Sequence, residues 1–318
     1  MVKKIITTSL FASVLLLSGC GDNEAEARLA AQQALDKGDF ASAITSLEAK
    51  ENRTDEENML LASSYMGAAG LGFSDTINLM ADSTSDNGNT DAFASFADNV
   101  KDSKDESTLN NIEKAIAYYA AIASSSPLAN QAVSRVASNE SNTTDIGDRD
   151  LFLGFAYLSK ATVVLSYLGD VAKLQGSQEA DEDMLASSCA IVHVYSPSSK
   201  LPTGCTDVTS VAEGDYKTLN ITLDNGNGMT YKRLATANGA DMLLTDYKDT
   251  SLTPVLVGGK SVTIKDALVD TINDGFDYIE KVAPEDVQKD IKKFKSELGV
   301  DGSGKVTSET LSKYIANN

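Results

Sequence analysis

The side chains able to do nucleophilic or metal chemistry are few, because the chain has one histidine, His193, and three cysteines. A catalytic triad or a histidine-containing zinc site would have to use His193. This residue alternates with Val192 and Val194, which predicts a short strand over 192–195. The sequence contains no Gly-x-Ser-x-Gly, Walker or dinucleotide-binding motif. We therefore expect a protein that is not an enzyme, with a carboxylate-based hydrolase as the least favoured alternative.

An acidic, glycine-rich segment near the C-terminus could bind a cation. Its candidate ligands are, in chain order, Asp301, Ser303, Lys305 and Glu309. Asp301 and Ser303 offer oxygens at alternate positions, and with the glycine that follows they resemble the calcium loop of an EF-hand. Gly299 stands at the first ligand position of that loop, and Glu309 lies one residue before the last. The resemblance implies a weak calcium site, and a glycine-rich turn between two helices is the alternative. We expect no other cofactor.

The N-terminus has the features of an exported protein. Two lysines precede the uncharged apolar run 5–17, which is shorter than the roughly 20 residues of a membrane-spanning helix. The run ends in Leu17-Ser18-Gly19-Cys20, which resembles the lipobox of bacterial lipoproteins. The resemblance implies that residues 1–19 are a signal peptide that is removed, and that a lipid is attached to the Cys20 thiol.

Lipid on Cys20 would hold a soluble domain at a membrane. Each buried methylene of the acyl chains, such as palmitate, contributes about 0.8 kcal/mol. Residues 20–26 would be a short polar tether. Gly21 stands where lipoproteins kept in the inner membrane of diderm bacteria tend to have Asp. The resemblance therefore implies the outer membrane, with the domain facing the periplasm.

The two remaining cysteines, Cys189 and Cys205, are expected to form a disulfide in that oxidising compartment. The bridge would close a loop of about 17 residues and stabilise the fold by about 3 kcal/mol in the chain-entropy model. A redox-active pair is the alternative, but such pairs usually have the spacing Cys-x-x-Cys.

The charge balance restricts the partners. The chain has 46 acidic and 27 basic residues, a formal net charge of −19. This charge argues against nucleic acid and against a face pressed on anionic headgroups. Two acidic clusters, 145–150 and 181–183, are predicted to be solvated loops rather than metal sites.

Residues 27–175 have apolar residues at helical spacing. The turn Gly38-Asp39-Phe40, followed by Ala43, Ile44 and Leu47, resembles the half-repeat of tetratricopeptide repeats. Further matching positions are Leu61, Ala62, Tyr65, Ala115, Ile116, Tyr119, Pro127, Leu153, Gly154, Ala156 and Tyr157. The resemblance implies a scaffold of stacked helix pairs, and an ordinary helical bundle is the alternative. Gly67, Gly70 and Gly72 are predicted to break the third apolar stripe, which runs from Leu60 to Ala68, and the apolar run 151–174 is predicted to form a buried central helix.

The remainder of the chain has a different pattern. Residues 176–262 are predicted to hold the disulfide loop and two short β-hairpins, one over 219–234 and one over 254–262. Residues 263–318 are predicted to form C-terminal helices, the first capped by Thr263. The expected fold is mainly α, a tetratricopeptide-like scaffold or bundle with a small disulfide-braced β-hairpin insertion.

The function expected from these features is a protein- or peptide-binding scaffold at the outer membrane, with other periplasmic or outer-membrane proteins as partners. A small-ligand-binding lipoprotein of a transport system is the alternative, since helical lipoproteins associated with TRAP-type transporters handle small ligands. Several tyrosines on predicted helices could pack inside the scaffold or line a concave binding surface. They are Tyr65, Tyr118, Tyr119, Tyr157 and Tyr167.

Overall fold

The computed structural model describes residues 23–71, 107–122, 148–170, 181–225, 228–282, 296 and 305–317. Its helices are α1 (Asn23–Asp36), α2 (Phe40–Glu48), α3 (Asp55–Ala68), α6 (Thr108–Ala121), α8 (Asp148–Leu168), α9 (Glu182–Tyr195), the π-helix η2 (Lys265–Val269), α10 (Asp270–Val282) and α12 (Ser308–Asn317). Its strands are β1 (Cys205–Glu213), β2 (Tyr216–Leu223), β3 (Thr230–Thr236), β4 (Met242–Leu243), β5 (Leu256–Val257) and β6 (Lys260–Ser261). Within the described ranges, helices, the two expected hairpins and the disulfide are present, and the four-stranded sheet makes the fold mixed rather than a purely helical bundle. The predicted C-terminal helices lie partly outside the described residues.

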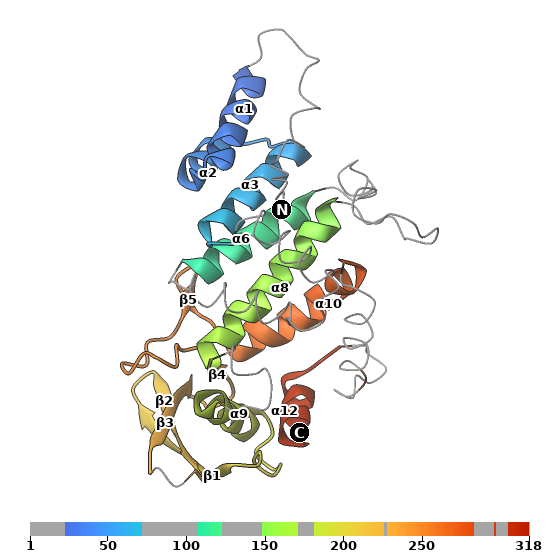
Figure 1. The fold of residues 1–318 in the computed structure, drawn as a ribbon. Helices are drawn as coiled ribbons and strands as arrows, with labels where there is room; N and C mark the ends of the chain where they lie inside the picture. The colour runs from blue at the N-terminus through green and yellow to red at the C-terminus, as the bar shows by residue number, and fades with distance from the viewer. Residues whose placement is uncertain are drawn as a thin grey trace, which may run out of the picture.

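The helices of the first half form an elongated array (Figure 1). Contacts join α1 to α2, α2 to α3, α3 to α6, α6 to α8 and α8 to α10, in chain order. The small sheet, α9 and α12 lie at the end of the molecule opposite α1. One continuous hydrophobic core runs from Ala31 in α1 to Leu311 in α12.

The turn between α1 and α2 is formed by the predicted residues. Gly38 has a φ of +73°, a left-handed conformation that favours glycine. The Asp39 carboxylate then caps α2 by accepting a hydrogen bond of 3.2 Å from the Ser42 amide. Short-range chemistry therefore determines where α1 ends and where α2 begins.

The predicted break is confirmed, because α3 ends at Ala68 and Gly70 follows with a φ of +77°. Gly67 itself lies inside the helix. A Cβ at position 67 would collide with the aromatic ring of Phe40. The missing side chain thus creates the space in which Phe40, at the start of α2, packs against α3. The helix is held at its other end by a capping box between Thr54 and Glu57.

The expected central helix is α8. Its window Arg149–Leu168 is long and apolar enough to cross a membrane, but 67% of it is buried inside the molecule. It packs between α6 and α10, and its one buried cation, Lys160, forms an ion pair of 2.8 Å with Glu113 on α6. Because most of this apolar surface is covered by other helices, α8 is the core helix of the array.

The sheet has the antiparallel order β1-β2-β3-β4. The predicted hairpin over 219–234 is confirmed by the pairing of β2 with β3, and the one over 254–262 by the pairing of β5 with β6. Strand β1, which pairs with β2 across a tight turn, was not among the strands predicted from the sequence. Helix α9 packs on one face of β1, β2 and β3.

The strand predicted over 192–195 is wrong, because these residues form the last turn of α9. The Asp181 carboxylate starts the helix by accepting a hydrogen bond from the Met184 amide. Ala190 and Val192 are fully buried in the core. Tertiary packing therefore outweighs the strand preference of the β-branched residues, and it leaves His193 half-buried on a helix.

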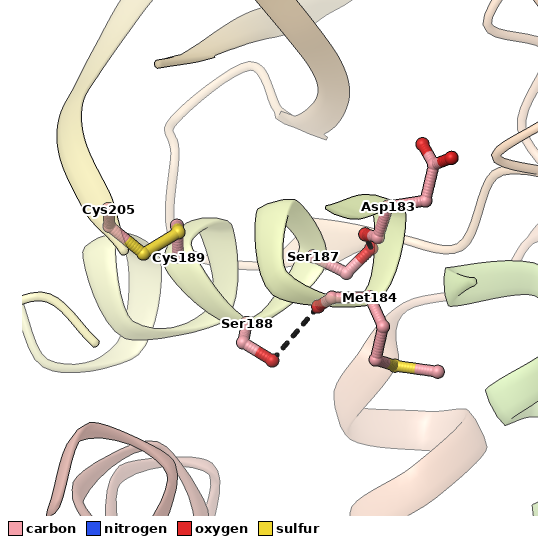
Figure 2. The surroundings of a disulfide bond; sticks show 6 residues. All are labelled: Asp183, Met184, Ser187, Ser188, Cys189 and Cys205. Carbon is pink, nitrogen blue, oxygen red and sulfur yellow. Dashed lines mark hydrogen bonds between the residues drawn. A yellow bond between two sulfur atoms is a disulfide. The ribbon is translucent and has the colours of Figure 1, made fainter. Parts of the chain in front are cut away.

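The Cys189–Cys205 disulfide is confirmed and joins α9 to the beginning of β1 (Figure 2). The two Cα atoms are 6.1 Å apart. Cys189 is completely buried, so the bridge lies where the helix faces the sheet.

Replacing both cysteines, as Cys189→Ala with Cys205→Ala, is expected to lower the free energy of unfolding by about 3 kcal/mol, because the unfolded chain regains loop entropy. Urea titration followed by circular dichroism measures the loss. A reducing agent should lower the free energy of unfolding of the native sequence by a similar amount and should leave that of the double variant unchanged. Equal stability of the oxidised and reduced native protein would contradict the prediction.

Candidate functional site

The five tyrosines singled out from the sequence separate into core and surface positions. Tyr119 and Tyr167 are buried, with 1% and 5% of their surface exposed. Tyr157 is half-buried and stacks on Tyr278 of α10, with ring centroids 6.0 Å apart. Tyr65 and Tyr118 also form a pair, and only this pair has cations over its rings among the described residues.

The pair joins α3 to α6. The rings of Tyr65 and Tyr118 stack with centroids 5.8 Å apart and planes inclined by 9°. Tyr65 is buried with 3% exposed, whereas Tyr118 is half-buried and has surface open to solvent. The buried Tyr65 (the inner ring) therefore holds the ring of Tyr118 (the outer ring) in one orientation, so that Tyr118 loses little conformational entropy when a partner binds.

Two cations flank the tyrosine pair. The Lys114 Nζ lies 4.7 Å from the centroid of the Tyr65 ring and donates a hydrogen bond of 2.9 Å to its hydroxyl. The Arg53 guanidinium carbon lies 5.2 Å from the centroid of the Tyr118 ring. Arg53 is itself oriented by a hydrogen bond of 2.7 Å to the Lys50 carbonyl. Both contacts are within the range of cation–π attraction.

A carboxylate from a third helix completes the group. Glu48, the last residue of α2, accepts hydrogen bonds from the hydroxyls of Tyr65 and Tyr118, the second at 3.4 Å. Its carboxylate is also 3.7 Å from the Lys114 Nζ. Burial raises the pKa of Tyr65 far above its usual value, and the hydrogen bond to Glu48 adds to this effect. The Tyr65 hydroxyl is therefore protonated at neutral pH and acts as a donor.

This arrangement is suited to binding. The side chains of Glu48 and Lys114 are 39% and 45% exposed, so they can exchange solvent contacts for contacts with a partner. Aromatic and arginine side chains dominate the energetics of protein interfaces. The part of Tyr118 that remains exposed can contact an apolar group of a partner, while Lys114 and Arg53 provide charges for a carboxylate. We name this group of five residues the tyrosine-pair site: Glu48, Arg53, Tyr65, Lys114 and Tyr118.

A simple sequence signal could have identified part of this site. Lys114 and Tyr118 are four residues apart on α6 and therefore lie on the same face of that helix. Tyr65 and Tyr118 were among the five tyrosines that the sequence singled out for either the core or a binding surface, but Glu48, Arg53 and Lys114 were not singled out. These three residues join the site only because α2, α3 and α6 pack together, and no local sequence pattern predicts that packing.

Only part of the candidate calcium loop is described. Asp301 and Ser303 lie outside the described residues, as does Cys20. Lys305 is exposed, and Glu309 forms an ion pair of 2.5 Å with Lys313 on α12. The hydrogen bond from Lys313 lowers the pKa of Glu309. Lipid on Cys20 and calcium binding at this loop both stay predictions.

The acidic cluster 181–183 is not the solvated loop that its sequence predicts. Asp181 is buried with 7% exposed, and its carboxylate accepts hydrogen bonds from the amides of Asp170, at 2.7 Å, and Met184, at 3.2 Å. Asp183 forms an ion pair of 3.5 Å with the buried Arg233. These acids cap a helix and pair with an internal cation. Within the described ranges, no group of three or more His, Cys, Asp or Glu side chains is arranged to hold a metal.

Comparisons with models of protein families, with curated proteins and with solved structures gave no match to this chain.

The two tyrosines are expected to differ in their contribution to stability. Tyr65→Ala should lower the free energy of unfolding by about 3 kcal/mol, because it leaves a cavity between α3 and α6. Tyr118→Ala should cost about 1 kcal/mol or less, because its ring is partly in water already. Thermal and urea unfolding measure both values. A larger loss for Tyr118→Ala than for Tyr65→Ala would contradict the assignment of inner and outer ring.

Proposed function

We propose that this chain is a lipid-anchored periplasmic protein of the outer membrane that binds a segment of another protein at the tyrosine-pair site. The observation that carries the proposal is the half-buried Tyr118 ring, which stacks on the buried Tyr65 ring, with Arg53 over the first ring and Lys114 over the second. Rigid aromatic and cationic side chains give large contact area with little loss of entropy on binding. The proposal assigns no reaction to the chain and no cofactor beyond the lipid.

The helical array supports a tetratricopeptide-like scaffold. Among the described helices, α1 packs on α2, α2 on α3, α3 on α6 and α6 on α8, an order that resembles stacked helical repeats. The turn at Gly38 and Asp39 and the buried Ala43 and Leu47 occupy positions that carry that resemblance. Such arrays present extended surfaces composed of several helices, and the tyrosine-pair site includes residues from α2, α3 and α6.

The charges of the site indicate the chemistry of the bound segment. Lys114 and Arg53 both lie at the rings, whereas Glu48 is engaged by two tyrosine hydroxyls and by Lys114. A proline, aliphatic or aromatic side chain can cover the Tyr118 ring, and a neighbouring carboxylate can pair with the exposed Lys114. The expected ligand is therefore a peptide segment with an apolar residue beside an acidic one.

Site-specific cross-linking tests the proposal in the native envelope. Benzoylphenylalanine in place of Ala117, an exposed residue of α6 one position from Tyr118, should capture a defined segment of a partner, which mass spectrometry identifies. A synthetic peptide with that sequence should bind the full-length protein. Tyr118→Ala and Lys114→Ala should each weaken its binding about tenfold or more, the effect of losing an interface anchor.

Tyr216→Ala is the matched control, because Tyr216 is a half-buried tyrosine on β2 at the other end of the molecule. It should bind the peptide as the native sequence does. Equal binding by Tyr118→Ala and by the native sequence would overturn the proposal. Native mass spectrometry of the extracted protein adds an independent outcome, since a retained small molecule would favour the ligand-binding alternative.

The anchor has a test of its own. Cys20→Ala should abolish incorporation of labelled palmitate and shift the protein from the membrane fraction to the soluble periplasmic fraction. The reason is that acyl chains contribute about 0.8 kcal/mol for each buried methylene and the acidic domain adds no attraction to anionic headgroups. Unchanged membrane association of the variant would contradict lipid attachment. Sucrose-gradient separation of the two membranes tests the predicted outer-membrane location.

A further inference from the structure

Strand β1 forms an open edge of the four-stranded sheet. Among the described residues it pairs with β2 alone, and it is nine residues long. Val208 is its one buried residue, Cys205 is half-buried, and the other seven are exposed. Natural sheets protect such edges with proline, charged side chains (lysine above all), bulges or very short strands. The printed register shift of β1 lies at its start, between Cys205 and Asp207, and its charged residues are Asp207 and Glu213. The sequence of β1 contains neither proline nor any basic residue.

The register of the β1–β2 hairpin identifies the unpaired backbone groups. Glu213 pairs directly with Tyr216 across a two-residue turn, so these two residues exchange both of their backbone hydrogen bonds. Hydrogen-bonded pairs then recur at every second residue along the strand. The amides and carbonyls of the intervening residues Val208, Ser210 and Ala212 therefore point away from β2, towards the open edge.

The charged side chains of β1 determine which strand fits beside it. Asp207, Thr209, Val211 and Glu213 project from one face of the sheet, so a neutral centre is flanked by a carboxylate at each end. A second copy of β1, antiparallel and centred on Ser210, would set Asp207 opposite Glu213, and like charges directly opposite are destabilising. The net charge of −19 adds to this repulsion between copies.

We propose that the β1 edge binds an extended segment of a partner protein as a fifth strand. The segment has uncharged, β-branched residues at its centre and a Lys or Arg at each end, opposite Asp207 and Glu213. The backbone of the segment forms hydrogen bonds with the outward amides and carbonyls of Val208, Ser210 and Ala212, and these bonds supply the affinity. The ion pairs of its Lys or Arg residues with Asp207 and Glu213 supply the selectivity. This site lies at the opposite end of the molecule from the tyrosine-pair site and does not depend on it.

Helix α9 and strand β2 hold the β1 edge in an extended conformation before any partner binds. The disulfide fixes Cys205, the first residue of β1, to the fully buried Cys189 of α9. Val208 is inserted into the core beside Ile221, its partner on β2. The strand is therefore ordered before a partner arrives, which reduces the entropy lost on association.

A designed peptide tests the proposal on the full-length protein. The probe is a nine-residue peptide, acetylated and amidated, with alternating Thr and Val and with Lys at the second and eighth positions. Fluorescence anisotropy measures its affinity, and amide hydrogen exchange followed by NMR locates it. Binding should slow exchange at Val208, Ser210 and Ala212. The same peptide with N-methyl groups on its edge-facing amides should not bind, because it cannot form the ladder.

Matched variants separate backbone pairing from other contacts. Ser210→Pro removes one outward amide and should weaken binding about tenfold or more. Ser210→Ala keeps that amide and should bind as the native sequence does. Asp207→Lys should weaken binding of the Lys-containing peptide and strengthen that of its Glu-containing counterpart. Where Ser210→Pro also lowers the melting temperature, the N-methylated peptide on the native protein decides the question.

Three results would overturn the proposal. The first is equal binding of the N-methylated and unmodified peptides, which would show that no ladder forms. The second is a tenfold loss of peptide affinity in Ser210→Ala, equal to the loss in Ser210→Pro. The third is slowed exchange at Val208, Ser210 and Ala212 in the protein alone, rising with its concentration, which would identify a second copy as the occupant.

Discussion

The hydrogen bonds of the buried Arg233 guanidinium determine how the sheet is placed on the helices. Arg233 lies on β3 with 2% of its surface exposed, and it donates hydrogen bonds to the carbonyls of Leu168 and Asp183 and to the Ser187 hydroxyl. These acceptors belong to the end of α8 and to α9. A buried charge is tolerated only where its donors are satisfied, so β3, α8 and α9 have to meet at this point. The Asp183 carboxylate, 3.5 Å away, offsets part of the charge.

Two further contacts make this junction rigid. The buried Asp181 carboxylate bridges the amide of Asp170, just after α8, to that of Met184 in α9. Further along α9, the disulfide of Cys189 attaches the same helix to β1. Helix α9 is therefore held at its start and again past its middle, and the orientation of the β1 edge follows from the position of α8. The same α8 packs on α6, which carries two of the five residues of the tyrosine-pair site, so one connected body supports both surfaces.

The two proposed binding surfaces rely on different physics. The tyrosine-pair site uses side chains, with a stacked ring between cations, and its selectivity depends on charge and shape. The β1 edge uses main-chain groups, which recognise extended conformation, and charged residues at its ends restrict the sequence. In the proposed anchored protein, Cys20 lies three residues before the start of α1, which places α1 nearest the membrane. The β1 edge is then the surface farther from the bilayer, where an extended segment of another envelope protein can reach it.

The sequence by itself determined the features that depend on neighbouring residues. The Gly38-Asp39 turn, the β2–β3 and β5–β6 hairpins and the Thr263 cap are local, and the disulfide joins the two cysteines that lie outside the N-terminal segment. Tertiary structure alone decided that 192–195 is helical, that Asp181 is buried and that Gly67 receives the ring of Phe40. It also decided that Glu48, Arg53 and Lys114 surround one pair of tyrosines. The reason is that turns and caps are stabilised within a few residues, whereas burial and charge pairing depend on groups distant in the chain.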